Sequence, residues 1–195
     1  GNEVAVLRLG CDPPRRIRMG RVERGVRRFV HECLLQDPVC DVEIALAYPN
    51  TYHVGMSNLG MHQVYSILNQ RGDTSCERLF LPDKDDILEF DRSNTKLFSL
   101  ESQWPVRDFD ILAFSVSFEH DYLNVLEILR LAGIPVDKKD RGPDDPLLVL
   151  GGICTFFNPE PLSEFFDVVI VGEGEEIAGD FIDVYKMNRG KQRQE

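Results

Sequence analysis

Glycines and polar side chains follow the apolar segments of this chain at positions where a ligand could be bound. Two short apolar runs, residues 147–150 and 168–171, end at Gly151-Gly152 and at Gly172-Glu173. Uninterrupted apolar runs of this length are typical of strands that are buried on both faces of a parallel sheet. Ligands of such sheets bind outside the carboxyl ends of the strands, and glycine lets the backbone approach them closely. The pattern therefore predicts a binding edge at these two turns.

The second of these turns, residues 172–176, carries three glutamates and does not fit a dinucleotide fingerprint. A pyrophosphate site needs G-x-G-x-x-G at the first strand-to-helix turn, whereas Glu173, Glu175 and Glu176 place negative charge where the phosphates would lie. Two roles remain open for them. They complement the positive end of the next helix, or Glu173 or Glu175 accepts hydrogen bonds from hydroxyl or amide groups of a ligand.

Two further groups of polar side chains follow predicted strands. His53 lies in the loop after the first strand, where a single histidine without an orienting acid is either a solvated side chain or a metal ligand. Ser115 and Ser117 end the central strand, where serine either donates to a ligand or caps backbone groups. No serine or cysteine can be paired with a histidine at one edge, so we predict no catalytic residue in this chain.

The segments that position these residues alternate between strands and helices. Strands are predicted at 42–48, 76–81, 109–117, 147–150 and 168–171, with a minor edge strand at 97–100; helical patterns cover 61–71, 83–92, 122–132 and 177–185. Such alternation predicts a doubly wound, three-layer α/β sandwich with a mostly parallel sheet of about five strands. We expect four loops to meet at one edge of this sheet: residues 49–57, 115–119, 151–155 and 172–176.

The two ends of the chain differ from its middle in predicted structure, and the N-terminal end also differs in charge. We predict an irregular extension at residues 1–40 with a helix at 19–36, an α/β domain at residues 41–188, and fraying of residues 189–195. The extension holds eight arginines against five acidic side chains, whereas the remainder holds 14 basic and 28 acidic side chains. An acidic body repels phosphate backbones, so nucleic acid is not an expected partner.

The spacing of the cysteines and the lengths of the apolar runs indicate the cellular compartment of the protein. The five cysteines form no CxxC pair, so this chain shows neither a zinc site nor an iron–sulfur site. An odd, scattered set of cysteines suits a reducing cytoplasm. No apolar run approaches the roughly 20 residues of a membrane-spanning helix. We therefore expect a cytoplasmic protein with no membrane partner.

Taken together, these loops resemble a known family. The matching segments are residues 47–60, 76–78, 97–102, 109–112, 132–135, 151–152, 157–161 and 172–176. In this order they resemble a family of uncharacterised radical-SAM (Fe–S oxidoreductase) proteins with a cobalamin-binding-like N-terminal domain. The resemblance implies a flavodoxin-like domain that precedes a radical-SAM barrel.

In such proteins the barrel holds a [4Fe–4S] cluster on a CxxxCxxC motif and cleaves S-adenosylmethionine to a 5′-deoxyadenosyl radical. That motif is absent from this sequence, so the barrel is expected downstream of a truncated chain. The resemblance therefore implies an accessory domain that is not catalytic alone and whose partner is the barrel of the same protein.

The resemblance also implies candidate cofactor-binding positions. Histidine-ligated cobalamin domains carry D-x-H-x-x-G, whereas this chain has Thr51-Tyr52-His53-Val54-Gly55, without the aspartate. Relatives without a histidine ligand bind cobalamin through the loops after the strands. The candidates are His53, Ser57, Ser115, Ser117, Gly151, Gly152, Gly172 and Glu173. The alternative is a module that packs or binds proteins without a cofactor, its crevice filled by Tyr52, Phe156 and Phe157.

Overall fold

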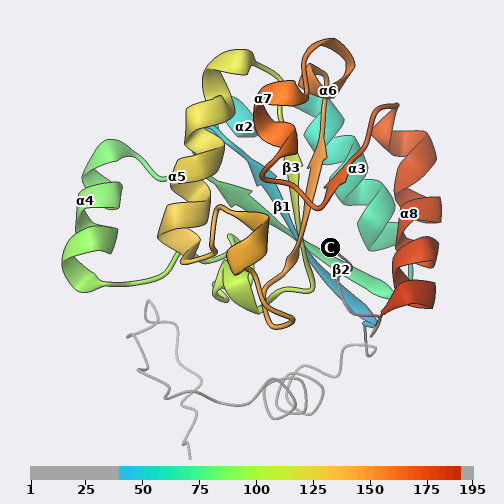
Figure 1. Ribbon diagram of the computed structural model, residues 1–195, viewed down its shortest axis with the longest axis horizontal. Helices are drawn as coiled ribbons and strands as arrows, with labels where there is room; N and C mark the ends of the chain where they lie inside the picture. Colours follow the sequence, from blue (N-terminus) through green and yellow to red (C-terminus); the bar gives the residue numbers. More distant parts are fainter. Residues whose placement is uncertain (1–39, 190–195) are drawn as a thin grey trace, which may run out of the picture. The chain divides into compact units, whose positions relative to one another are not determined.

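The computed structural model describes residues 40–189 and contains a five-stranded, fully parallel sheet (Figure 1). Its strand order, β2-β1-β3-β4-β5, is the order of flavodoxin-like doubly wound folds. The strands are β1 (Val42–Tyr48), β2 (Thr74–Phe80), β3 (Ile111–Ser115), β4 (Leu147–Gly151) and β5 (Val168–Val169). The predicted fold class is confirmed, and β3 is the central strand.

Helices cover both faces of the sheet. They are α2 (Tyr52–Gly55), α3 (Leu59–Gln70), α4 (Lys84–Ser93), α5 (Tyr122–Ala132), α6 (Cys154–Phe157), α7 (Glu160–Ser163) and α8 (Gly174–Asn188), with short 3₁₀ turns at Val106–Asp108, Glu119–Asp121 and Lys138–Asp140. Helices α3 and α8 lie side by side on one face, and α5 lies on the other with α4 beside it (Figure 1). Within the described residues, no helix combines the length and apolar composition that crossing a membrane requires.

The core consists of one apolar layer on each face of the sheet. Ile44 and Leu46 of β1 pack with Met61 and Leu68 of α3 and with Ile182 of α8. Alternate residues of the same strand, Ala45 and Ala47, belong to the opposite layer, which includes much of α5. A strand buried on both faces is apolar on both, which is why β4 reads as an uninterrupted apolar run and β1 is interrupted only at Glu43, near its start.

Helix α5 ends where the sequence indicates. Its buried residues, among them Val125, Ile128 and Leu129, follow the helical period. Gly133 has a φ of 70°, a left-handed conformation that favours glycine, and its N–H donates to the Arg130 carbonyl at 3.1 Å. The predicted stop at Gly133 is therefore confirmed.

Two predicted strands differ in the structure. Residues 97–100 form only an isolated bridge between Phe98 and Pro105, so the predicted edge strand is wrong. The reason is that neighbouring amides bond elsewhere: the Leu97 N–H donates to Leu131 of α5 and the Leu100 N–H to Arg78. Strand β5 is shorter than its apolar run, because it pairs with β4 over two residues only.

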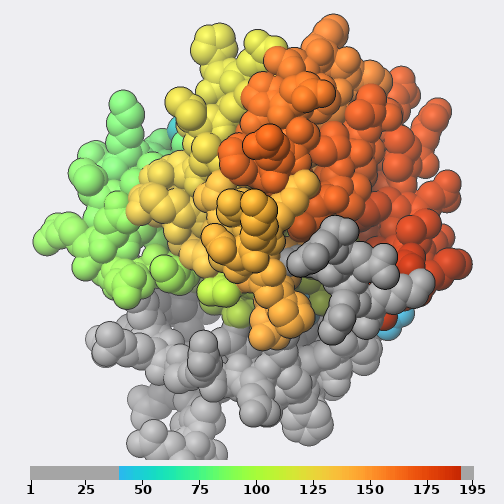
Figure 2. Space-filling model, in the orientation of Figure 1, coloured from blue at the N-terminus to red at the C-terminus, as the bar shows by residue number. Residues whose placement is uncertain are grey.

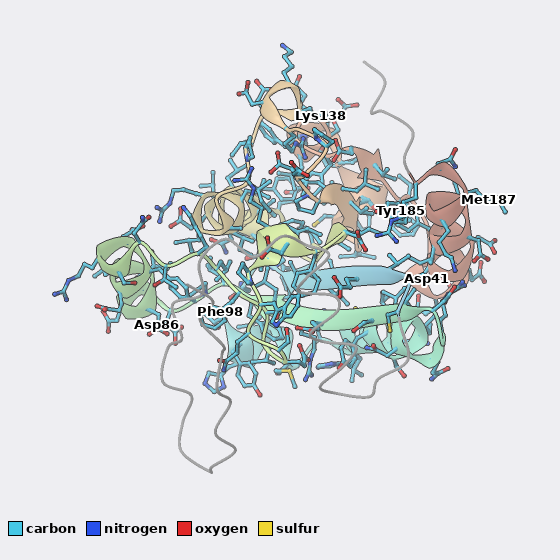
Figure 3. The ribbon with its side chains drawn as sticks, turned by 90° about the horizontal axis from the view of Figure 1, so that it is seen from below. Asp41, Asp86, Phe98, Lys138, Tyr185 and Met187 are labelled. Carbon is cyan, nitrogen blue, oxygen red and sulfur yellow. The ribbon has the colours of Figure 1, made fainter. Side chains whose placement is uncertain are left out.

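At the amino ends of the strands, ion pairs join α8 to the sheet. Lys186 lies 2.8 Å from the carboxylates of both Asp41 and Asp73, and Arg189 lies 2.8 Å from Asp110. Figure 3 shows Asp41 beside the C-terminal part of α8. Arg189, the first residue of the predicted frayed tail, is thus held in place. Residues 190–195 and the predicted helix at 19–36 lie outside the described residues.

Candidate functional site

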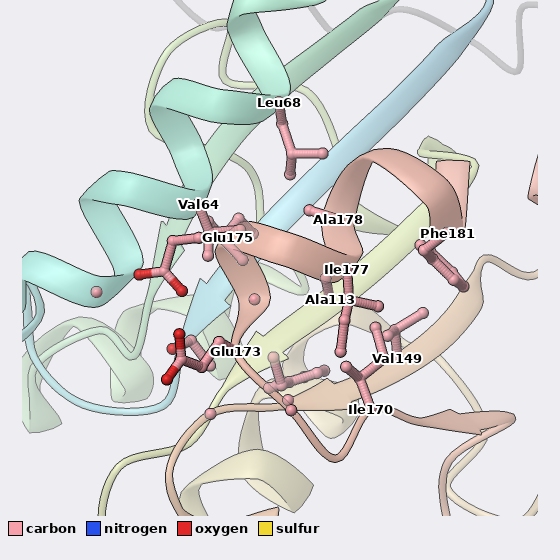
Figure 4. Close-up of a pocket in the computed structure, with 18 of the residues that line it drawn as sticks. Val64, Leu68, Ala113, Val149, Ile170, Glu173, Glu175, Ile177, Ala178 and Phe181 are labelled. Carbon is pink, nitrogen blue, oxygen red and sulfur yellow. The ribbon is translucent and has the colours of Figure 1, made fainter. Parts of the chain in front are cut away.

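A cavity of about 430 Å³ lies between the sheet and helices α3 and α8 (Figure 4). Apolar side chains from β1, β3, β4, both helices and the segment after β5 form most of its wall: Ile44, Leu46, Val64, Leu68, Ile111, Ala113, Val149, Ile170, Ile177, Ala178, Phe181 and Ile182. Strands β1 and β3 flank the point where the strand order reverses. In open α/β sheets, ligands bind at such a point, outside the carboxyl ends of the strands.

Polar residues enter the cavity lining from the carboxyl edge. They come from the end of β3 and from the starts of α3 and α8: Asn58, Ser115, Ser117, Glu173 and Glu175. Asn58 caps α3, since its Oδ1 accepts a hydrogen bond from the Met61 N–H at 2.8 Å. The Asn58 amide also donates to the Ser117 hydroxyl at 3.2 Å. The start of α3 is therefore tied to the end of β3.

The carboxylates of Glu173 and Glu175 lie close together at the start of α8, on the side facing Val64 of α3 (Figure 4). Glu173 precedes the helix but makes no capping hydrogen bond with its side chain. Both side chains are exposed, and within residues 40–189 neither has an ion-pair partner. Both carboxylates are therefore available to accept hydrogen bonds from a ligand.

Gly152 fixes the path of the loop after β4. Its φ is 100°, and a Cβ at this position would lie 2.5 Å from the backbone nitrogen and oxygen of Val116. Gly151 has no such constraint, because its Cβ would meet only the Phe114 carbonyl at 3.8 Å. The Thr155 hydroxyl, 2.8 Å from the Ile170 carbonyl, joins this loop to the end of β5. The requirement for glycine at 152 is thus structural, and it brings two cavity-lining loops together.

Six of the eight predicted site residues line this cavity: Ser115, Ser117, Gly151, Gly152, Gly172 and Glu173. His53 and Ser57 do not. They lie in and after α2, where the Ser57 hydroxyl donates to the His53 carbonyl at 2.9 Å and the His53 ring packs edge-on against Tyr52. Three of the four predicted loops therefore contribute to the cavity, and the loop after β1 does not.

The three aromatic residues expected to fill the crevice leave it open. Tyr52 packs edge-on against Phe80, with 5.4 Å between ring centroids, and does not line the cavity. Phe157 is 79% exposed and is likewise absent from the lining. Phe156 lines the cavity but is half exposed. The space between α3, α8 and the sheet is therefore accessible to a ligand.

A buried polar cluster on the opposite face escaped the sequence-based prediction. The Asp121 carboxylate accepts hydrogen bonds from the side-chain amides of Asn50 at 2.8 Å and Asn124 at 3.2 Å, and Asn124 also donates to the Pro49 carbonyl. Burial raises the pKa of Asp121. This cluster joins the loop after β1 to α5. No group of three metal-ligating side chains occurs within the described part of the chain.

Large apolar side chains are exposed around the carboxyl edge. We call them the apolar rim; they are Leu59, Phe118, Ile153, Phe156, Phe157 and Val171. They follow β3, β4 and β5 or begin α3. The segments after β4 and β5 form a continuous surface with α8 in Figure 2. Exposed apolar residues that gather around one site are typical of surfaces that contact a partner or a ligand.

Comparison with known proteins identifies relatives of this chain. The family described as radical SAM proteins, N-terminal, matches residues 60–195. The uncharacterized protein MJ0966 of Methanocaldococcus jannaschii is 29% identical over 132 residues, which is 68% of this chain and 24% of that protein. The chain thus spans about a quarter of the length of this relative. No solved structure matches the chain.

Proposed function

Since this chain belongs to the family of radical SAM proteins, N-terminal, we propose that its α/β domain holds cobalamin or a substrate at the carboxyl edge of the sheet, for use by a radical-SAM barrel of the same protein. Radical-SAM proteins in general use a [4Fe–4S] cluster and S-adenosylmethionine. The domain itself is accessory, and its role is to bind and orient.

The cavity at the β1–β3 reversal is the observation that supports this role. It is apolar in its walls and polar where the strands end, which is the usual composition of a small-molecule site. Its volume accommodates part of a molecule as large as cobalamin and leaves the rest above the strand ends. A bound ligand would then lie between this edge and whatever packs against it.

The fit to cobalamin depends on its amide-bearing periphery rather than on a histidine. Ser115, Ser117 and Glu173 offer hydroxyl and carboxylate groups to amides, and the backbone at Gly151 permits close approach. His53 lies outside the cavity lining, so its position gives no support to cobalt ligation by this chain. When bound, cobalamin supplies a redox-active cobalt centre; the residues of this domain only hold it in place.

Binding of hydroxocobalamin tests the proposal. We expect corrin absorbance to co-elute with the protein after incubation and desalting. Ala113→Phe, which fills the cavity from β3, should abolish co-elution, whereas His53→Ala should leave the visible spectrum unchanged. Unfolding curves of both variants show whether they are folded. Absence of corrin absorbance with the unchanged protein would remove cobalamin from the proposal.

The apolar rim favours a second candidate function, in which the domain packs against the barrel without binding a cofactor. Its exposed side chains are suited to burial in an interface. In a protein that also contains the barrel, Phe118→Ser with Phe157→Ser should then speed proteolysis between the two domains. Leu88→Ser, at an exposed apolar residue of α4, is the matched control and should not. Equal proteolysis of both variants would contradict an interface at the rim.

A further inference from the structure

The cavity is asymmetric in charge. The residues that line it include Glu173 and Glu175 but no lysine, arginine or histidine. An anionic ligand would therefore meet two negative charges at the carboxyl edge and no basic side chain within the lining. A hydrogen-bond donor or a cation would meet two carboxylates that have no other ion-pair partner among residues 40–189.

The backbone around the cavity, taken alone, would favour an anionic ligand. Helix α3, with 12 residues, and helix α8, with 15, both begin at the cavity, since Asn58, Gly60, Glu173 and Gly174 line it. Helix N-termini attract anions through their free N–H groups and their dipole. At the start of α8, Glu173 and Glu175 supply the negative charge from the protein itself, so the attraction of that helix for anions is already compensated.

The rest of the cavity requires an apolar group. Between the sheet and helices α3 and α8 the walls are aliphatic or aromatic, among them Leu46, Val64, Ala113 and Phe181. A polar group placed among them would lose its hydration without gaining a partner. The two requirements, an apolar body and a head that donates hydrogen bonds, must therefore be met by one molecule.

We infer that the cavity selects ligands with an apolar body and a cationic or hydrogen-bond-donating head, and that Glu173 and Glu175 determine this selectivity. Ligands with a phosphate or carboxylate head are rejected. The inference rests on the proposed function only in taking this cavity as the binding site. It concerns any ligand of the site, whether cofactor or substrate.

A matched pair of probes measures the selectivity. 2-Naphthylmethylamine and 2-naphthoate share an apolar ring and differ in the charge of the head at pH 7. The dissociation constant of each is measured by equilibrium dialysis with the whole chain. One exposed charge at about 4 Å contributes roughly fivefold in water, so we expect the amine to bind at least about tenfold more tightly. The preference should shrink as salt is added, because both carboxylates are exposed.

Variants assign the preference to the two carboxylates. Glu173→Gln with Glu175→Gln should bring the two dissociation constants within about twofold of each other, since the charge that distinguishes the probes is removed. Glu176→Gln removes the same charge from the same helical turn, outside the cavity lining, and should keep the preference. Tighter binding of the naphthoate, equal binding of both probes, or an unchanged preference in the double variant would overturn the inference.

The result of the probe experiment can be distinguished from the result of the hydroxocobalamin experiment. If hydroxocobalamin binds and the probes show no preference for the amine, the selectivity fails and cobalamin binding stands. If the amine is preferred and hydroxocobalamin does not bind, the selectivity stands and the site serves another ligand. If neither probe nor hydroxocobalamin binds, both fail.

Discussion

The two edges of the same sheet are built from opposite kinds of contact. At the amino edge, Asp73 accepts hydrogen bonds from Arg71 and Lys186, and Arg189 pairs with Asp110. At the carboxyl edge, Glu173 and Glu175 are without an ion pair among the described residues, and the apolar rim is exposed. The comparison teaches that the charged groups of the amino edge are paired within the domain, whereas the carboxyl edge leaves two carboxylates without an ion pair among the described residues and exposes apolar side chains.

Helix α8 connects the two edges and shows the contrast in one element. Its first turn carries Glu175 and Glu176, and its last turn carries Lys186, so the charges at both ends complement the helix dipole. At the C-terminal end Lys186 also bridges Asp41 and Asp73. At the N-terminal end the glutamates face the cavity or solvent instead. The same helix therefore stabilises one edge and leaves the other available.

The largest effect on stability is expected at Gly152, in the loop after β4. It would show that the carboxyl edge depends on backbone geometry rather than on ion pairs. Gly152→Ala should lower the free energy of unfolding by about 3 kcal/mol, because the new Cβ would collide with Val116 in a left-handed conformation. Gly151→Ala, one residue earlier, is the control and should cost less than about 1 kcal/mol. Urea unfolding followed by circular dichroism measures both. Equal losses would contradict the role assigned to Gly152.

An intermediate effect is expected at the amino edge. Hydrogen bonds from Arg71 and then from Lys186 hold the pKa of Asp73 well below its ordinary value of 3.8. Asp73→Asn should therefore cost about 1.5 kcal/mol at pH 7, a value reduced for the partial exposure of the pair. Glu173→Gln, at the other edge, should change the free energy of unfolding by less than about 0.5 kcal/mol.

The sign of the pH dependence follows from the lowered pKa. A carboxyl group with a lower pKa in the folded state stabilises the protein above its unfolded-state pKa, and the stabilisation is lost as the pH falls toward the folded-state value. The difference between the unchanged protein and Asp73→Asn should thus be full at pH 7 and shrink below about pH 3.8. Urea unfolding at pH 7 and pH 2.5 measures it; a difference that grows in acid would contradict the pairing.

The smallest effect on stability is expected at the apolar rim. Phe157 is 79% exposed, so Phe157→Ser should change the free energy of unfolding by less than about 0.5 kcal/mol. The same substitution should lower the fluorescence of bound ANS, which reports exposed apolar surface. A large loss of stability would mean that Phe157 belongs to the core, and the contrast between the edges would weaken.

Much of the fold could be predicted because burial on both faces leaves a strong signal. Strands β1, β3 and β4 are mostly apolar and helix α5 has helically spaced apolar residues, and each was found where the pattern indicated. Residues 97–100 were predicted wrongly because Leu97 is buried like a strand residue, while its amide donates to Leu131 of α5. Side-chain burial alone does not predict which carbonyl accepts the hydrogen bond of a backbone N–H.

The site could be predicted in part. Ser115 ends β3, Gly152 follows β4, and Glu173 lies in the turn between β5 and α8, so parallel topology brings them to one cavity. His53 lies within α2, the single helical turn that follows β1, and is outside the cavity lining. Asp121 accepts a hydrogen bond from Asn50, 71 residues away, and no local sequence pattern predicts that contact.

Chemical-shift mapping of the whole chain tests the central claim most directly. On titration with 2-naphthylmethylamine, the backbone amides of Gly151, Gly152, Gly172 and Glu173 should shift, and those of Asp41, Asp73 and Asp110 should not. Shifts confined to the carboxyl edge are the predicted result. Shifts at the amino edge, or none at either edge, would contradict the assignment of binding to one edge and stabilisation to the other.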